Sequence, residues 1–248
     1  MRNWIIGAAA ALAVAAAPSV AAAQATGYVG LAYSSSDFGG ATDDVESWGA
    51  EGAVAFSGSG SIVFEVDAAL TTTDDTAGGD DTGYGLVGHI YARNSDHLLG
   101  GFVGIAGADD SETWLAGLEA SKFFSQWTLA GAVFYGNNDD ADVDGFGANV
   151  EGRVFLNDNF RLNGNIGWVS VDDGVDEDDA MLYGVGGEYQ FAQLPISIGA
   201  GYSTVDFDGG DVDTWTVGVR WNFGGQTLMD RDRNGASQAS VIGLANAF

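Results

Sequence analysis

The stretch TWTVGVRWNF, residues 214–223, decides the fold because its apolar and polar residues alternate strictly. Successive side chains of an extended chain point to opposite faces. The apolar face of this segment consists of Trp215, Val217, Val219, Trp221 and Phe223. The opposite face is small or polar and includes Gly218 and Arg220. A period of two therefore predicts a β-strand.

Twelve segments of this kind follow one another along the chain, about one every 16 to 20 residues. We predict strands at about 27–36, 47–57, 62–72, 83–93, 98–107, 113–123, 127–136, 145–155, 160–170, 181–191, 196–204 and 214–223. The connections alternate between long and short. The six long ones hold 24 of the 35 Asp and Glu residues and no Lys or Arg. Antiparallel strands joined by hairpins place all long connections at one end.

Alternation also occurs in soluble β-sandwiches, but three features favour a membrane barrel. Aromatic residues lie at both ends of the apolar faces, as in the girdles at two membrane interfaces; we include Tyr28 and Phe155 among them. Charges occur in mid-strand on the opposite faces, which a lumen tolerates. Strands of about 10 residues tilted by about 40° cover an apolar band of about 25 Å. The predicted fold is all-β: a transmembrane antiparallel up-and-down β-barrel of about 12 strands with long acidic extracellular loops and short periplasmic turns.

At this point residues 26–223 resemble the porin-like outer-membrane β-barrels of Gram-negative bacteria. The resemblance rests on the turns, the loops, the aromatic girdles and a last strand that ends in Phe223. It implies contact with outer-membrane lipid and assembly by the barrel-assembly machinery, which reads such a final aromatic residue. In that family the aromatic residue usually ends the chain, whereas residues 224–248 follow here. We predict a periplasmic tail for them and leave its role open.

Residues 1–23 are predicted to be a signal peptide for export. The segment has a positive start at Arg2, an apolar run, and an A-x-A cleavage site at Ala21 and Ala23. An anchor helix is the alternative, which the processing signal disfavours. The expected domains are therefore the signal peptide 1–23, the barrel 24–223 and the tail 224–248.

Composition limits the possible partners. The chain has 8 Lys and Arg against 35 Asp and Glu, a formal net charge of −27. Such a charge repels a phosphate backbone, so we expect no nucleic acid partner. Hydrophobic residues make up 46% of the chain, which argues against disorder.

One stretch, DADVDGFGANVE at residues 140–151, fills every position of the EF-hand calcium pattern. An EF-hand loop lies between two helices, but this stretch lies between two predicted strands. Glu151 is expected in mid-strand beside Arg153, so we predict no metal site; weak cation binding by the loop aspartates stays open. The glycine pattern of residues 83–88 opens a strand rather than a helix, so no nucleotide cofactor is expected.

Catalysis is not expected, because only two histidines occur. His97 is predicted in a short turn, and His89 faces the lumen with no nucleophile suggested nearby. The charged mid-strand residues are predicted to line a pore: Glu51, Glu65, Asp67, His89, Arg93, Glu119, Glu151, Arg153, Arg161, Glu188 and Arg220. Small inward residues would keep a path open: Gly30, Ala32, Gly49, Ala53, Gly184, Gly199, Gly201 and Gly218.

The predicted function is a porin for the passive diffusion of small hydrophilic solutes. The acidic loops should make its mouth prefer cations. Divalent cations would bind these loops weakly and bridge them to lipopolysaccharide phosphates. The alternative is a non-conducting structural or adhesive outer-membrane barrel that acts through its acidic loops. A soluble exported β-protein is a second alternative.

Overall fold

The computed structural model describes residues 25–39, 44–57, 60–75, 79–108, 111–138, 142–225 and 227–236. The predicted signal peptide, residues 1–23, and the last part of the predicted tail, residues 237–248, lie outside the described residues. Among the described residues, no helix is long and apolar enough to cross a membrane.

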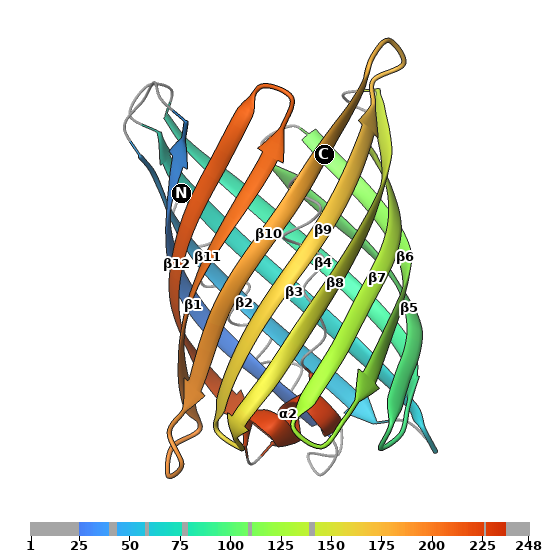
Figure 1. Cartoon of the computed structure of the whole chain (residues 1–248), viewed down its shortest axis with the longest axis vertical. Helices are drawn as coiled ribbons and strands as arrows, with labels where there is room; N and C mark the ends of the chain where they lie inside the picture. The colour runs from blue at the N-terminus through green and yellow to red at the C-terminus, as the bar shows by residue number, and fades with distance from the viewer. Residues whose placement is uncertain are drawn as a thin grey trace.

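Twelve strands form a closed antiparallel barrel, in which each strand pairs with its neighbours in the sequence and β12 pairs with β1 (Figure 1). The strands are β1 (Ala25–Phe38), β2 (Val45–Ser57), β3 (Ile62–Asp75), β4 (Gly79–Arg93), β5 (His97–Ala108), β6 (Ser111–Phe123), β7 (Trp127–Asn138), β8 (Val143–Asn157), β9 (Phe160–Asp172), β10 (Glu177–Gln190), β11 (Ile196–Phe207) and β12 (Gly210–Phe223). The prediction of a 12-stranded all-β barrel is confirmed, and Phe223 ends the strand that closes it.

The predicted and observed strand ends agree within two residues at the short-turn end of the barrel. At the long-loop end every strand extends one to four residues further than predicted. The extensions contain acidic pairs such as Asp144 opposite Asp172 and Asp206 opposite Asp211. Sheet pairing uses backbone groups, so polar residues that read as loop in the sequence continue the hairpins beyond the apolar band.

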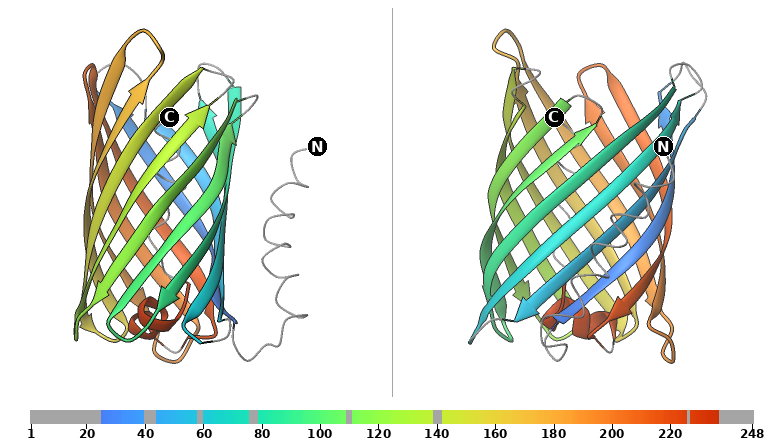
Figure 2. Two further views of the ribbon diagram at one scale, coloured as in Figure 1. Left: turned by 90° about the vertical axis from the view of Figure 1, so that its right-hand side faces the viewer. Right: turned by 180° about the vertical axis from the view of Figure 1, so that it is seen from behind.

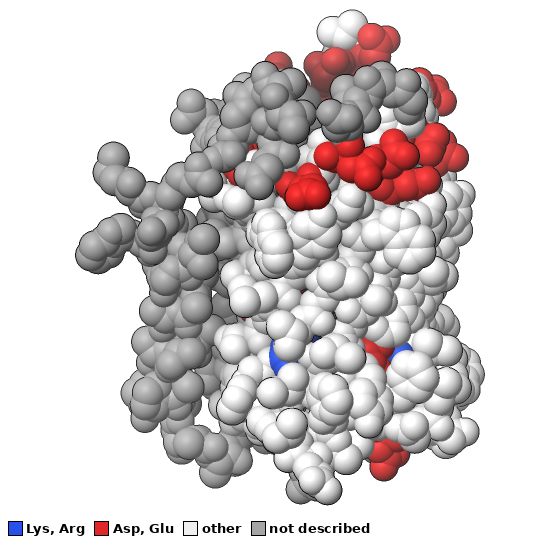
Figure 3. Space-filling model, turned by 90° about the vertical axis from the view of Figure 1, so that its left-hand side faces the viewer, with Lys and Arg blue, Asp and Glu red and all other residues white. Residues whose placement is uncertain are grey.

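The outer surface of the barrel is apolar. Large side chains such as Leu99, Val103 and Leu118 are about two-thirds exposed there. Figure 3 shows one side of this surface, with acidic residues at the long-loop end above a wall almost without charge. A contiguous exposed apolar surface of this kind needs lipid around it. The alternate residues of each strand face the interior.

Two aromatic residues depart from the predicted girdles. Tyr28 and Phe155 were expected on the outer face near the short turns, but both point inward and are 9% and 1% exposed. Tyr28 lies two residues from the inward-facing Gly30 and so on the same face of β1. Phe155 lies two residues from the inward-facing Arg153 and so on the same face of β8. The prediction was wrong because it placed them by residue type instead of by register.

After β12 the chain turns back into the barrel. Gly224 has a φ of 76°, and a Cβ there would lie 2.2 Å from the Ala25 carbonyl oxygen, so only glycine fits this turn. The helix α2 (Leu228–Asn234) follows, with the Thr227 hydroxyl accepting a hydrogen bond from the Asp230 N–H. Figures 1 and 2 show α2 at the short-turn end, within the opening of the barrel.

Candidate functional site: the lumen of the barrel

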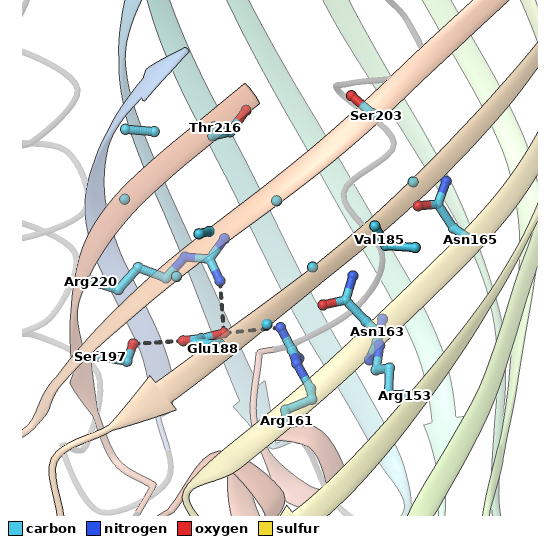
Figure 4. A pocket seen from close by; sticks show the side chains of 18 of the residues that line it. Arg153, Arg161, Asn163, Asn165, Val185, Glu188, Ser197, Ser203, Thr216 and Arg220 are labelled. Atoms are coloured by element: carbon cyan, nitrogen blue, oxygen red, sulfur yellow. Dashed lines mark hydrogen bonds and ion pairs between the residues drawn. The ribbon is translucent and has the colours of Figure 1, made fainter. Parts of the chain in front are cut away.

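A cavity of about 360 Å³ lies inside the barrel. Its wall comes from β1, β2 and the inward faces of β8–β12, and α2 contributes Arg231. The lining includes many small or polar residues, such as Gly199 and Gly201 and the amides Asn163 and Asn165, which Figure 4 labels. Strand alternation places these side chains here, because every second residue of each strand must face inward.

Glu188 on β10 is the centre of the charge network in this cavity. Its carboxylate accepts hydrogen bonds from Arg161 at 2.9 Å, Arg220 at 3.1 Å and Arg231 at 2.8 Å. The Ser197 hydroxyl adds a fourth at 2.6 Å (Figure 4). Three guanidinium groups around one buried carboxylate give a local excess of positive charge.

Two further glutamates offset that excess. Glu51 on β2 accepts a hydrogen bond from Arg220 at 2.6 Å. Glu151 on β8 accepts one from Arg153, also at 2.6 Å. The cavity therefore contains three glutamates and four arginines, and its own charge is close to neutral.

Asp232 of α2 meets the wall directly below this cavity. Arg153 donates a hydrogen bond to one of its oxygens at 2.8 Å, and Thr128 donates to the other at 2.6 Å. Burial alone would raise the pKa of Asp232, but the Arg153 charge and the two hydrogen bonds outweigh it. The pKa of Asp232 therefore lies below the usual aspartate value, and the group is ionised at neutral pH.

A second polar cluster lies on the other side of the lumen, on β3, β4 and β6. The His89 ring lies 3.1 Å from Glu119 and 3.6 Å from Asp67, measured between nitrogen and oxygen. The Tyr91 hydroxyl donates to Glu65 at 2.7 Å. All five side chains are buried, at most 6% exposed, and none lines the cavity.

The same side of the lumen is filled by apolar side chains. Val87, Phe102, Leu115 and Phe134 from β4–β7 form one buried cluster. The Phe134 ring covers Gly147, where a Cβ would come within 2.2 Å of the ring. We call these inward faces of β3–β7 the packed side and the cavity wall the cavity side.

The eleven residues predicted to line a pore fall into three places. Six lie on the cavity side: Glu51, Glu151, Arg153, Arg161, Glu188 and Arg220. Four form the cluster on the packed side: Glu65, Asp67, His89 and Glu119. Arg93 donates to the backbone oxygens of Gly235 and Asn234, just after and at the end of α2.

The sequence reasoning missed two residues that shape the cavity. Tyr28 lies beneath two guanidinium groups, with the Arg220 and Arg231 carbons 4.6 and 5.5 Å from its ring centre. The signal that could have found it is its spacing of two residues from the inward-facing Gly30, which places it on the same face. Arg231 lies in the tail, where a Thr-x-x-Asp capping pattern at residues 227–230 marked a helix start.

From Val143 onward, the calcium-like stretch is a strand rather than a loop. Its described part, from Asp142 to Glu151, runs into β8, and Glu151 faces the lumen in an ion pair with Arg153. Among the described residues, no group of three or more His, Asp or Glu side chains is arranged so that it could hold a metal ion.

A closed antiparallel barrel with an apolar outer surface and a charged interior defines a β-barrel protein of the outer membrane. Residues 87–230, which are 144 of the 248, match the family described as Gram-negative porin. Because the match covers more than half of the chain, this protein belongs to the Gram-negative porin family. The resemblance to porin-like barrels and the outer-membrane location, both predicted from the sequence, are confirmed.

Solved structures with the same fold are distant in sequence. An outer membrane channel from Pseudomonas putida F1 has a TM-score of 0.62 and 13% identity, covering 81% of this chain and 96% of that one. The KdgM porin, in complex with disordered oligogalacturonate, has a TM-score of 0.57 and 9% identity, covering 79% and 99%. The translocator domain of the autotransporter NalP from Neisseria meningitidis has a TM-score of 0.57 and 12% identity, covering 88% and 95%. No curated protein sequence matches this chain significantly.

Proposed function

We propose that this porin is a passive diffusion pore for small hydrophilic solutes, with a preference for cations. The observation that supports it best is the cavity of about 360 Å³ inside the barrel, lined by charged residues, asparagines and glycines. A lumen with such a lining holds water and lets hydrated solutes enter. The six charged residues of the cavity side would then line the pore.

The preference for cations would come from the long-loop end. The cavity itself is close to neutral, with four arginines and three glutamates. The acidic residues at the long-loop end are not balanced in this way, and they lie where solutes enter. Backbone N–H groups of Asp176 and Val175 hold the pKa of Asp173 below its usual value, which keeps this carboxylate charged. Fixed negative charge raises the local concentration of cations and repels anions.

We propose transport rather than catalysis. His89 is 3% exposed and is enclosed by Asp67, Glu119 and the Phe102 ring. A general base must reach the proton that it removes, and a substrate in the cavity does not contact this ring.

One observation favours the alternative of a non-conducting barrel. Helix α2 lies in the opening at the short-turn end (Figure 2). If α2 closed the lumen completely, the acidic loops would be the only surface left for function.

Planar-bilayer recording with the purified mature protein tests the proposal. We expect discrete conductance steps, and a reversal potential of cation-selective sign under a potassium chloride gradient in dilute salt. An open channel with a zero or anion-selective potential would contradict the cation preference. A folded barrel that gives no conductance even without α2 would contradict the porin function.

A further inference from the structure

Helix α2 and the residues next to it contact opposite walls of the barrel. Asp232 bonds to Thr128 on β7, and the Ala236 N–H bonds to Thr26 on β1 at 3.2 Å. In the ring of twelve strands, β1 and β7 are half of the circumference apart. A segment that reaches both walls must cross the lumen.

A second pair of opposite walls gives the same result. Arg231 bonds to Glu188 on β10, and Arg93 on β4 donates to the Gly235 oxygen at 2.8 Å. Strands β4 and β10 are also half of the ring apart. Two crossing directions place α2 in the middle of the opening rather than against one wall, as the perpendicular views of Figures 1 and 2 together show.

The size of the opening makes this position restrictive. Twelve strands spaced about 4.8 Å apart and tilted by about 40° leave about 24 Å between opposite backbone walls. Inward side chains take about 5 Å at each wall, half of the distance between packed sheets, so the bore is about 14 Å wide. A helix about 10–12 Å wide and, with seven residues, about 10 Å long fills roughly two thirds of that cross-section.

Two charged groups of α2 are buried against the barrel wall. Arg231 is 3% exposed and Asp232 is fully buried, and each is paired with a wall residue of opposite charge. A buried charge is tolerated only when it is paired. The two pairs, Arg231–Glu188 and Asp232–Arg153, therefore fix the position of the helix.

The wall residues of the two ion pairs keep other charged partners when the helix leaves. Without Arg231, Glu188 keeps its bonds to Arg161 and Arg220. Without Asp232, Arg153 keeps its bond to Glu151. The two groups on α2 would regain water, so breaking the two ion pairs leaves neither Glu188 nor Arg153 without a partner.

We propose that α2 is a displaceable plug that restricts passage through the short-turn mouth of the pore, held by the ion pairs Arg231–Glu188 and Asp232–Arg153. The proposal rests on the proposed porin function and adds a residue-level control of that function. It assigns a role to the tail, and it makes Arg231 and Asp232 determinants of conductance.

The first test compares single-channel conductance in planar bilayers. The full mature chain is compared with a chain that lacks residues 227–248 and with the double variant Arg231→Ala/Asp232→Ala. Removal of the plug should raise the conductance about threefold, in proportion to the freed cross-section. Asn234→Ala is the matched control: its side chain is exposed and bonds to Asp230 within the helix, so its conductance should equal that of the parent.

The second test fixes the plug in the double variant. The chain has no cysteine, so Thr26→Cys with Gly235→Cys introduces a single possible disulfide. A Cβ at Gly235 would lie 2.9 Å from the Thr26 Oγ1, close to the separation that a disulfide needs. Oxidation should return the conductance of the double variant to the parental value, and reductant should raise it again about threefold.

The outcomes separate the two proposals. Equal conductance of the parent, the shortened chain and the double variant would overturn the plug and leave the porin function standing. If no folded variant conducts, the shortened chain included, the porin function is overturned. If the shortened chain fails to fold, the disulfide decides: conductance that ignores oxidation and reduction overturns the plug.

Discussion

The cavity side and the packed side of the lumen are built from the same strand pattern but have opposite contents. Inward positions on β10–β12 include Gly184, Gly199 and Gly218, and all three line the cavity. Inward positions on β4–β7 include Phe102 and Phe134, which fill the space. The void is therefore off-centre in the barrel.

This difference teaches that alternation and size are separate signals. Alternation alone decides which residues face inward. The volume of those residues decides whether the interior is open or filled. All eight of the small inward residues noted in the sequence lie on β1, β2 and β10–β12, which are strands of the cavity wall.

The largest expected effect concerns stability on the packed side. Phe102 is 3% exposed and its ring lies over Gly117 and beside His89. We expect Phe102→Ala to lower the free energy of unfolding by about 3–5 kcal/mol, because it leaves a void among packed side chains. Thr216→Ala, on the cavity side, should change it by less than about 0.5 kcal/mol.

Denaturant unfolding of both variants in lipid vesicles measures the difference. Equal losses would remove the distinction between the packed and the cavity side.

A smaller effect on stability is expected when an arginine is introduced on the outer face of β12 rather than on its inner face. Val217 is 53% exposed on the outer face, and its neighbour Thr216 lines the cavity at the same depth. Val217→Arg should cost about 2–4 kcal/mol because the charge enters the membrane. Thr216→Arg should assemble normally, because the charge enters the cavity. Gly218 is a poorer control, since a Cβ there would lie 3.1 Å from the Leu31 oxygen.

The fraction of each variant that reaches the heat-modifiable folded form measures assembly. If Thr216→Arg fails to assemble to the same extent as Val217→Arg, then the lumen has no space for an arginine at the level of Thr216.

Most of the barrel was predictable from the sequence, because a period of two over twelve segments leaves few alternatives. The paired charges were not. Arg220, for example, bonds to Glu51 at a separation of 169 residues, and only closure of β1 against β12 brings them together. The extra length of the strands at the long-loop end was also missed, since Asp and Gly disfavour strands unless a partner strand holds them.

The tail shows a different limit. Its helix has seven residues, too few for a hydrophobic period, and it exists because the barrel wall surrounds it. The capping pattern at Thr227 marked its start, but the partners Glu188 and Arg153 lie on strands with no local relation to it.

Acid should affect the cavity side through Asp232. Its pKa is below the usual value, so its ion pair is fully present above about pH 3.9, the ordinary aspartate pKa. The pair is lost as the pH falls through the lower pKa of the folded state. We expect conductance to rise by up to about threefold in that acid range, since roughly two thirds of the bore is freed.

Several charged groups and one hydroxyl face Asp232 and set this response. They are Arg153 with its partner Glu151 on β8, Arg161 on β9, Arg233 on α2, and the Thr128 hydroxyl on β7. Asp232→Asn should conduct at the raised level at every pH. A full acid response in that variant would assign the effect to other carboxylates.

The smallest effect concerns the acidic end of the molecule. Residues 172–179 contain six carboxylates at the β9–β10 hairpin and no opposite charge. A unit charge about 10–15 Å from the solute path contributes roughly 0.1 kcal/mol through 0.1 M salt. Conversion of all six to amides should therefore lower the cation concentration at this mouth about two- to fourfold, and the cation-to-anion permeability ratio should fall with it.

The matched control changes the other end. Asp96 and Asp158 lie in short turns, and Asp96→Asn with Asp158→Asn should leave the ratio nearly unchanged, because few carboxylates are removed from that mouth. In 1 M salt the Debye length falls to about 3 Å, and the effect of the six carboxylates should vanish. Reversal potentials at both salt concentrations measure this. A ratio that is insensitive to the six substitutions in dilute salt would move the selectivity from the acidic hairpins to the lumen, where Glu51, Glu151 and Glu188 would have to outweigh the arginines beside them.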